Sequence, residues 1–490
     1  MPVVHRILDP EPVPSLAAYL QRGGGNGLAA ARALGPAATI DEVTAAGIRG
    51  RGGAGFPTGV KWRTVTANAS EVVCSTVVVN AAEGEPGSFK DRALIDTNPY
   101  RILEGALIGA FAVGADEVIV GMKRTATRQI ARMRSAIAEM QASELATGVH
   151  LDLVEGPPEY LLGEETGLLE VIDGRYPFPR IAPPYRRGTE ELVENAADLT
   201  SGSGLSAHVE MAGAGDEEAP PTLVDNAETL AHVTLALAQG ANWFREVGTD
   251  ESPGTVLCTV SGCVVRAGVG EFAMGTPLRE IIESVGGGAR AGRTIRAVLQ
   301  GAAAAIITAN QLDTPASWEG MQAIGSGLGA AAFIVLDDQT DIASIGASVS
   351  RFLAVESCGQ CTPCKQDGLL ITEALGRVAT SVGTEEDLDV VRRRIETVAF
   401  GARCSLATQQ QVVIGSMLEA FGTDFEARVE HSAPAGEPVA IIPMVDLHDG
   451  IAVLDEEHAR KQPDWTYDAH WSGKSPADRL DDHRAHPEKL

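Results

Sequence analysis

Basic side chains are scarce in this chain of 490 residues. It contains 39 Lys and Arg against 66 Asp and Glu, which leaves a formal net charge of −27 at pH 7. Nucleic-acid phosphates are bound by clustered Lys and Arg, and anionic lipids attract the same side chains. We therefore expect no nucleic-acid partner and no direct electrostatic attachment to a membrane surface.

Long apolar runs are missing as well. The best candidate, residues 105–122, is interrupted by Asp116 and Glu117, whereas a membrane-spanning helix needs about 18 uncharged residues. Residues 1–15 also lack the apolar core of a secretory signal. We expect a cytoplasmic protein without direct membrane insertion, in which any association with a membrane depends on partner subunits.

Cysteine is rare too, with seven in the chain, yet three lie close together: Cys358, Cys361 and Cys364. Thiolates select zinc, copper(I) or iron–sulfur clusters. A triplet spaced by two residues with a distant fourth cysteine is typical of an iron–sulfur cluster, whereas zinc sites more often use two separated pairs. The only cysteine downstream is Cys404, so we expect these four to bind a [4Fe–4S] cluster, with a structural zinc site as the alternative.

The remaining cysteines do not suggest disulfide bonds. Their odd total and irregular spacing are typical of a protein in a reducing compartment. They lie in or near predicted strands, so we expect them to be small core residues: Cys74, Cys258 and Cys263.

Apolar residues make up 44% of the chain, enough to fill several cores. Between residues 75 and 156, short β-branched runs alternate with helical periodicity, which predicts a mainly parallel sheet with helices on both faces. A further helix is predicted over 225–244. From about residue 254 a hairpin, a helix and two more strands are predicted, and four helices follow between 341 and 421.

This pattern divides the chain into regions of different character. We expect an α/β domain over 1–248 with a mobile acidic insert at 188–221, a small α+β domain over 249–338, a four-helix domain over 339–432 and an extended polar tail over 433–490.

The glycine-rich stretch RGRGGAGFPTG at residues 49–59 needs a separate explanation. Glycines allow a backbone to approach a ligand closely and expose N–H groups to anions. The stretch lacks the strand and helix start of the dinucleotide-binding fingerprint. Alone it predicts only a tight turn, so its meaning depends on the motifs that follow.

Five motifs occur in order along the chain: GIRGRGGAGFPTGVKW (47–62), NAAEGEPGSFKDR (80–92), YLLGEETGLLE (160–170), DNAETLAHV (225–233) and ESCGQCTPCKQDG (356–368). Together they closely resemble the NADH-binding flavoprotein subunit of respiratory complex I, a module shared with NAD-linked hydrogenases and formate dehydrogenases. The resemblance covers about residues 18–425. It implies an α/β fold with a Rossmann-like FMN-binding domain, a ubiquitin-like β-grasp domain and a C-terminal helical bundle that holds a [4Fe–4S] cluster.

The resemblance also implies an activity. NADH delivers a hydride to FMN, and single electrons then pass to the cluster and to a small thioredoxin-like [2Fe–2S] partner subunit, or the same path runs in reverse to reduce NAD. A flavin is needed between the two because nicotinamide donates two electrons at once and an iron–sulfur cluster accepts one. The terminal acceptor and the choice of NADH over NADPH stay open at this point.

The resemblance assigns roles residue by residue. A shared FMN and NADH cleft is lined by Gly50, Arg51, Gly52, Gly53, Gly55 and Gly59. Phe56 stacks on the adenine, Lys61 reaches cofactor phosphates, and Asn80 bonds the flavin. The NADH riboses and nicotinamide end are held by Glu83 and Glu85. A further turn of the cleft is formed by Tyr160, Gly163, Glu164 and Glu165, with Glu165 near the nicotinamide.

The FMN phosphate is expected at the start of the 225–244 helix, beside Asp225, Asn226 and Thr229, although Asn226 and Thr229 also suit plain helix capping. Two residues depart from the family pattern. Ala82 stands where the family has an aspartate, and Asp225 where it has an asparagine. These departures motivate an alternative, an electron-conducting or structural relative that keeps the cluster and has lost FMN and NADH use.

Overall fold

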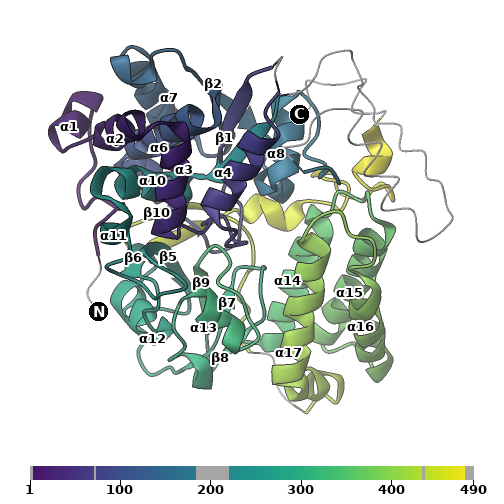
Figure 1. Ribbon diagram of the computed structural model, residues 1–490. Coiled ribbons are helices and arrows are strands. Elements are labelled where there is room, and N and C mark those ends of the chain that lie inside the picture. The colour runs from purple at the N-terminus through teal and green to yellow at the C-terminus, as the bar shows by residue number, and fades with distance from the viewer. Residues whose placement is uncertain (1–3, 71–72, 184–219, 433–435, 481–490) are drawn as a thin grey trace.

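The structure is a computed structural model that describes residues 4–70, 73–183, 220–432 and 436–480. Figure 1 shows a sheet surrounded by helices at the top, a second sheet at the lower left and four long helices at the lower right. Apart from Pro220 and Pro221, the predicted insert at 188–221 lies outside the described residues. None of the described helices is long and apolar enough to span a membrane.

The first sheet has four parallel strands in the order β3-β2-β1-β4. They are β1 (Ser75–Ala81), β2 (Ala115–Lys123), β3 (His150–Gly156) and β4 (Thr222–Asn226). Successive side chains of a strand face opposite ways. Val77 therefore joins the core formed with helices α6 (Pro99–Val113) and α10 (Ala227–Gln239), while Val78 packs with residues of helix α8 (Glu165–Ile172). The prediction of a mainly parallel sheet is confirmed.

Helices surround this sheet on both faces. Their bounds are α1 (Leu16–Gln21), α2 (Asn26–Leu34), α3 (Pro36–Ala46), α4 (Thr58–Ala67), α5 (Lys90–Thr97), α6 (Pro99–Val113), α7 (Thr127–Gln141), α8 (Glu165–Ile172), α10 (Ala227–Gln239) and α11 (Ala241–Phe244). A short 3-10 helix, η2 (Tyr160–Gly163), leads into α8.

The prediction that the 225–244 helix begins at Asp225 is wrong. Asp225 and Asn226 end strand β4, and α10 begins only at Ala227. Strand β4 pairs in parallel with β1, and its first four residues are buried. The Asn226 side chain accepts the backbone N–H of Glu228 and so caps α10. The polar pair in this motif therefore marks a strand-to-helix junction.

The second sheet has five strands in the order β6-β5-β9-β7-β8. They are β5 (Thr255–Gly262), β6 (Gly268–Ala273), β7 (Ile295–Gln300), β8 (Ile307–Thr308) and β9 (Ala332–Asp337). The predicted hairpin is confirmed by the antiparallel pairing of β5 with β6. Four short helical segments accompany the sheet: α12 (Leu278–Ile281), η3 (Ile282–Gly286), η4 (Ala309–Gln311) and α13 (Trp318–Ala323). The two-residue β8 and the six-residue α13 are too short to give a periodic signal.

The three remaining cysteines divide between the core and the surface. Cys258 and Cys263 are buried, as predicted. The prediction for Cys74 is wrong, because this residue is exposed just before the buried residues of β1 begin.

Four helices pack together where the sequence predicts four. They are α14 (Ile342–Glu356), α15 (Thr362–Ala379), α16 (Glu385–Thr397) and α17 (Leu406–Val429). Their apolar faces form one core with residues of β7 and β9, so the helices are attached to the second sheet. Thr384 and Asp387 form a capping box at the start of α16.

The prediction of an extended tail is wrong for residues 436–480, here called the C-terminal segment. It forms a hairpin of β10 (Met444–His448) and β11 (Ile451–Leu454) and lies against both the first sheet and the four helices (Figure 1). Arg92 Nη1 donates to Met444 O at 2.6 Å. Lys461 is 1% exposed and its Nζ lies 2.8 Å from Glu356 Oε1. Buried ionic partners distant in sequence hold the segment.

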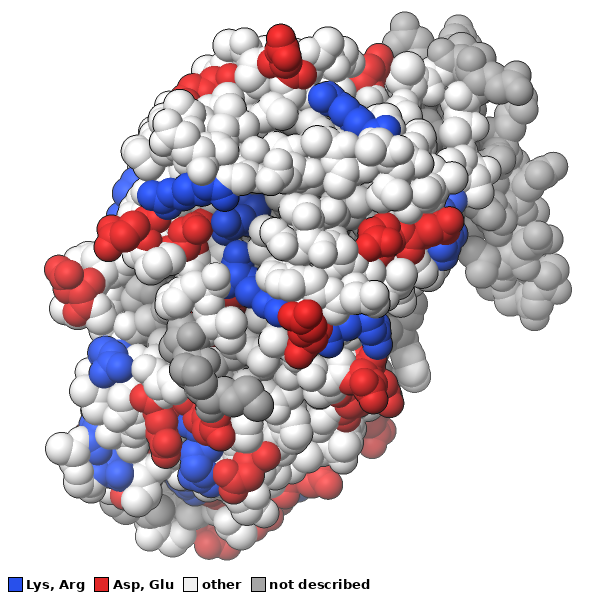
Figure 2. All heavy atoms as spheres, turned by 60° about the vertical axis from the view of Figure 1, so that its left-hand side comes forward, with Lys and Arg blue, Asp and Glu red and all other residues white. Residues whose placement is uncertain are grey.

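Surface charges add less to this attachment. Figure 2 shows one face on which Lys and Arg lie beside Asp and Glu. A pair of this kind joins Arg128 to Asp446 at 3.0 Å, with the arginine half exposed. Exposed ion pairs contribute about 0–1 kcal/mol each, so the buried pair between Lys461 and Glu356 should dominate.

Replacing Lys461 by Met tests that attachment. The substitution leaves a buried carboxylate without its ammonium partner, which costs about 3–5 kcal/mol. We expect limited proteolysis to cut Lys461→Met within residues 436–480 faster than the wild type. Lys474 is exposed, so Lys474→Met is the matched control and should be cut at the wild-type rate. Equal rates in the two variants would contradict the role of the buried pair.

Candidate functional site

The glycine-rich loop lies against the N-terminus of α10. The Arg51 backbone N–H donates to Thr229 Oγ1 at 2.8 Å, and a Cβ on Gly52 would lie 3.4 Å from Asn226 Cβ. Gly53 and Gly55 have φ of 128° and 64°, values that favour glycine. The structure therefore brings two motifs separated by more than 170 residues to one place.

Some residues of this loop have structural partners of their own. Arg51 is 2% exposed, and its guanidinium donates to Thr255 O in the second sheet at 3.0 Å. A Cβ on Gly59 would lie 2.1 Å from Thr44 Oγ1, so this glycine lets α4 pack on α3. Thr229 is fully buried with its hydroxyl engaged by the loop. In contrast, Phe56 is 49% exposed and accessible to a ligand ring.

Lys61 forms the ionic centre beside the loop. Its Nζ lies 3.0 Å from Glu165 Oε1, 2.8 Å from Val224 O and 3.9 Å from Asp225 Oδ1. Burial opposes its charge, but Glu165 and Asp225 outweigh burial and raise the pKa of Lys61. Three predicted site residues from three motifs thus meet at one ammonium group.

Asp225 does not stand as an isolated charge near the cleft. Its Oδ2 accepts the Trp62 indole N–H at 2.7 Å, and it is 4% exposed. Burial raises the pKa of Asp225 to about 6, against the opposing effects of Lys61 and the Trp62 hydrogen bond. The family asparagine is therefore replaced by a carboxyl group that has both a hydrogen-bond donor and a cation.

Asn80 and Asn226 end neighbouring strands. Asn80 Nδ2 donates to Gly163 O at 2.9 Å, and Asn226 Nδ2 donates to Asp91 Oδ2 at 2.8 Å. Lys90 Nζ lies 3.3 Å from Asn226 Oδ1. The carboxyl ends of adjacent parallel strands are the usual place for ligands in such sheets.

Sequence reasoning missed Lys90 and Asp91. Lys90 Nζ lies 2.8 Å from Asp91 Oδ1 and 2.9 Å from Glu228 Oε2, and all three groups are buried. Burial opposes the charge on Lys90, but Asp91 and Glu228 outweigh it and raise the pKa of Lys90. The charged triplet KDR inside an otherwise buried motif was the available signal. This network orients the Asn226 side chain.

Glu83 and Glu85 occupy different environments. The Glu83 carboxylate accepts from Ser88 Oγ at 2.5 Å and Arg92 Nε at 2.9 Å, and its side chain is 4% exposed. It is therefore engaged at the start of α5. Glu85 accepts from Tyr160 Oη at 2.5 Å and from the Ala302 backbone N–H at 2.5 Å. Burial raises the pKa of Glu85.

The turn at residues 160–165 connects the first sheet to the four helices. Tyr160 Oη lies 3.1 Å from Nε2 of Gln409, a residue of α17. Glu164 caps α8 by accepting the Gly167 N–H at 2.7 Å. Gly163 faces Ala82, because a Cβ on Gly163 would lie 3.2 Å from Ala82 O. Ala82 itself is 2% exposed in an apolar cluster, so the missing carboxylate is replaced by packing.

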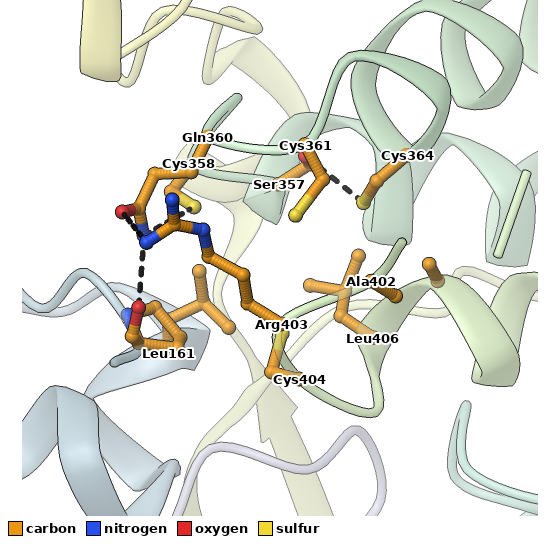
Figure 3. A pocket seen from close by; sticks show the side chains of 12 residues that line it. Leu161, Ser357, Cys358, Gln360, Cys361, Cys364, Ala402, Arg403, Cys404 and Leu406 are labelled. Atoms are coloured by element: carbon orange, nitrogen blue, oxygen red, sulfur yellow. Dashed lines mark hydrogen bonds between the residues drawn. The ribbon is translucent and has the colours of Figure 1, made fainter. Parts of the chain in front are cut away.

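The four predicted cluster ligands line one cavity. Figure 3 shows Cys358, Cys361 and Cys364 on one side and Cys404 on the other. Cys361 is the N-cap of α15 and Cys364 lies in its first turn, while Cys404 directly precedes Ser405, the N-cap of α17. Two helix N-termini therefore approach the cavity, and their partial positive charge favours thiolates.

The thiols are buried enough to resist ionisation alone. Burial raises the pKa of Cys364 to about 11 and that of Cys404 to about 12. Binding of the cluster by these four thiols must therefore release their protons. Ser357 Oγ lies 3.3 Å from Cys364 Sγ, and Gln360 Nε2 lies 3.5 Å from Cys358 Sγ. These polar neighbours suit an anionic centre.

The donor arrangement differs from that of a single-ion site. Among the described residues, no three His, Cys, Asp or Glu side chains are placed to hold one metal ion. Four thiols instead line one cavity, and four thiolates are the donor set of a [4Fe–4S] cluster.

Comparisons with known proteins match both regions. The Nuo51 FMN-binding domain matches residues 43–235, and the NADH-ubiquinone oxidoreductase-F iron-sulfur binding region matches residues 345–428. An NADH-quinone oxidoreductase subunit of Rhizobium meliloti is 32% identical over 88% of this chain and 98% of its own length. The chain belongs to this family of NADH-quinone oxidoreductase subunits.

Other relatives in this family come from hydrogenases. The NADP-reducing hydrogenase subunit HndC of Solidesulfovibrio fructosivorans is 32% identical over 86% of this chain and 82% of its own length. A solved NAD+-reducing [NiFe]-hydrogenase chain in the H2-reduced state aligns with a TM-score of 0.71 and 30% identity. That alignment covers 86% of this chain and 66% of the hydrogenase chain, so the present chain spans just under two thirds of that relative.

Family membership confirms FMN and a [4Fe–4S] cluster as the cofactors of this oxidoreductase subunit. The iron–sulfur interpretation therefore stands in place of the zinc alternative. The residues present fit both groups. The loop at 50–55, Lys61 and the two strand-end asparagines offer N–H groups and one cation suited to an anionic flavin cofactor. The four thiols suit the cluster.

Substitution of Cys404 tests the cluster site. We expect Cys404→Ser to lose most iron and acid-labile sulfide, because one of four thiolate ligands is removed. Iron and sulfide analysis and the visible absorption of the purified protein measure this loss. Cys74→Ser, on an exposed cysteine, is the matched control. Wild-type iron content in Cys404→Ser would show that Cys404 is not a ligand.

Asp225→Asn tests the buried carboxyl group. The pKa of Asp225 is raised in the folded chain from 3.8 to about 6, so its ionisation destabilises the fold as pH rises through this range. Asparagine keeps an oxygen for Trp62 and removes the charge. We expect the free energy of unfolding to rise by at most about 3 kcal/mol at about pH 8, with the gain vanishing below about pH 4.

Unfolding of both proteins across this pH range measures the difference. A gain that is constant with pH, or largest in acid, would show that ionisation of Asp225 is not its cause.

Proposed function

We propose that this chain oxidises NADH and passes the electrons singly through its cluster to a partner subunit, or runs the same path in reverse. The observation that carries the proposal is the bridge at Tyr160. Its hydroxyl contacts Glu85, four residues after the end of β1, and Gln409, five residues beyond the cluster cysteine Cys404. The FMN-binding region and the iron–sulfur region are therefore in direct contact.

FMN, when bound, supplies the conversion between two-electron hydride transfer and one-electron transfer. The chain's own residues position the reactants. We assign Lys61 and Asn226 to the flavin phosphate, Asn80 to the flavin, and Phe56 to the adenine ring of NADH. The glycines at positions 50, 52, 53 and 55 leave room for close approach. Arg51, Gly59 and Thr229 serve the same cleft by holding its walls.

We assign carboxylates around the cleft to the nicotinamide end of NADH. Glu165 lies 3.0 Å from Lys61, so it combines an acceptor for substrate amide or hydroxyl groups with a fixed orientation. Glu85 is held by Tyr160 and Ala302 and shields the cleft from solvent. Hydride transfer requires close placement and exclusion of water. Glu83, Gly163, Glu164 and Asp225 support these positions.

The proposal extends to architecture and assembly. We assign a Rossmann-like FMN-binding domain to 1–248, a ubiquitin-like β-grasp domain to 249–338 and an iron–sulfur helical bundle to 339–432. Several relatives are named as subunits of NADH-quinone oxidoreductase or of hydrogenase, which supports partner subunits here as well. The proposed electron acceptor is a small thioredoxin-like [2Fe–2S] subunit, and any membrane association depends on such partners.

The decisive experiment uses the purified chain with its cofactors. We expect a flavin spectrum that NADH bleaches, and NADH-dependent reduction of an artificial one-electron acceptor. Lys61→Met should weaken FMN retention about tenfold or more, since a charged hydrogen-bond donor is lost, while iron content stays at the wild-type level. Protein with full iron and sulfide content but no flavin would instead support the electron-conducting relative.

A further inference from the structure

A second cavity lies between the first sheet and the C-terminal segment. One wall is formed at the carboxyl ends of β1 and β2, by Ala81 and Lys123, and the other by residues of the C-terminal segment that include Lys461 and Tyr467. It is separate from the cleft at Asn226 and from the cysteine cavity. Carboxyl ends of parallel strands commonly bind ligands.

Three cations line this cavity: Arg92, Lys123 and Lys461. Arg92 has a carboxylate partner in Glu83 at 2.9 Å, and Lys461 has one in Glu356 at 2.8 Å. Lys123 has none within 4.0 Å among the described residues, and its Nζ donates only to Pro158 O, at 3.0 Å. It is 7% exposed. A buried ammonium group without a counterion is costly, so the site favours an incoming anion.

The surrounding charges strengthen this preference. Burial lowers the pKa of Lys123 to about 8, and Lys461 and Arg92 act in the same direction, against Glu356 and Glu159. The carboxylates that line the cavity are already engaged. Glu83 is held by Arg92, and Asp455 accepts the backbone N–H of His458 at 3.3 Å.

One further polar atom of the cavity wall lacks a partner. His458 lines the cavity and is 3% exposed. Its Nε2 lies 2.7 Å from Glu356 Oε1, while its Nδ1 is buried without a hydrogen bond to any residue in the described part of the chain. With the Nε2–H donated to Glu356, Nδ1 accepts a hydrogen bond, so a hydroxyl group of the ligand would satisfy it.

We propose that this cavity binds the phosphoryl group of a small metabolite, with Lys123 as its counterion. A phosphoryl group offers several acceptor oxygens, which suits the Lys123 ammonium, whose three N–H groups have one hydrogen-bond partner among the described residues, Pro158 O. Tyr467 and Met444 provide the apolar and aromatic surface for the rest of the molecule. Lys123 lies outside the proposed flavin and NADH cleft, which the cavity borders at Glu83, and binding at Lys123 does not depend on that activity.

Binding would also hold the C-terminal segment in place. The segment forms one wall of the cavity, and its Lys461 and His458 contact Glu356, two residues before Cys358. An anion bound between sheet and segment therefore stabilises the arrangement next to the cluster loop.

Calorimetric titration of the cofactor-loaded protein tests the proposal, with inorganic phosphate and glycerol 3-phosphate as probes at constant ionic strength. We expect one saturable site per chain, and at least about tenfold weaker binding in Lys123→Met. Lys474→Met, the same change on an exposed lysine of the C-terminal segment, should bind as the wild type does. Tighter binding of glycerol 3-phosphate than of phosphate identifies an organic phosphate as the ligand class.

Several outcomes would overturn the proposal. These are the absence of saturable binding of either probe, unchanged binding in Lys123→Met, or acetate binding as tightly as phosphate. A measurement on the wild type alone covers the case in which Lys123→Met does not fold. Phosphate should slow amide hydrogen exchange within residues 443–467 and leave α16 unaffected; unchanged exchange at 443–467 contradicts the site.

Discussion

The buried carboxylate of Glu356 connects the parts of this protein. Its Oε2 accepts the Tyr160 backbone N–H at 2.8 Å, and its Oε1 lies 2.8 Å from Lys461 Nζ and 2.7 Å from His458 Nε2. One carboxylate at the end of α14 thus joins the turn below the first sheet, the four helices and the C-terminal segment. A charge at 1% exposure is tolerated only with such a complete set of partners, so each part depends on the other two.

This arrangement places the two redox regions next to each other. The cluster cysteines begin two residues after Glu356, and Tyr160, which bonds the same carboxylate through its backbone, contacts Glu85 and Gln409 through its hydroxyl. The cleft side and the cluster side are therefore fixed by one shared set of hydrogen bonds rather than by a flexible link. A fixed separation suits electron transfer between two bound groups, because neither has to move during turnover.

Local sequence patterns predicted the features that depend on local chemistry. The β-branched run at 77–79 gives a buried strand, and the cysteine spacing gives a shared cavity. Features that depend on distant partners were missed. Lys461 and His458 look like surface residues until Glu356, about a hundred positions earlier, is placed beside them. Likewise, nothing local in the motif shows that Glu83 is taken by Arg92, or that Gly59 serves helix packing.

The position of the C-terminal segment has a consequence for how the protein is made. The cysteines at 358–404 leave the ribosome before residues 436–480 do, and synthesis at about 5–20 residues per second leaves a delay of seconds. During that interval Glu356 has no Lys461, and the loop at Gly359 has no Ser475 against it. The order of synthesis therefore leaves the loop that begins at Cys358 uncovered for this interval, which ends when the last segment folds against it.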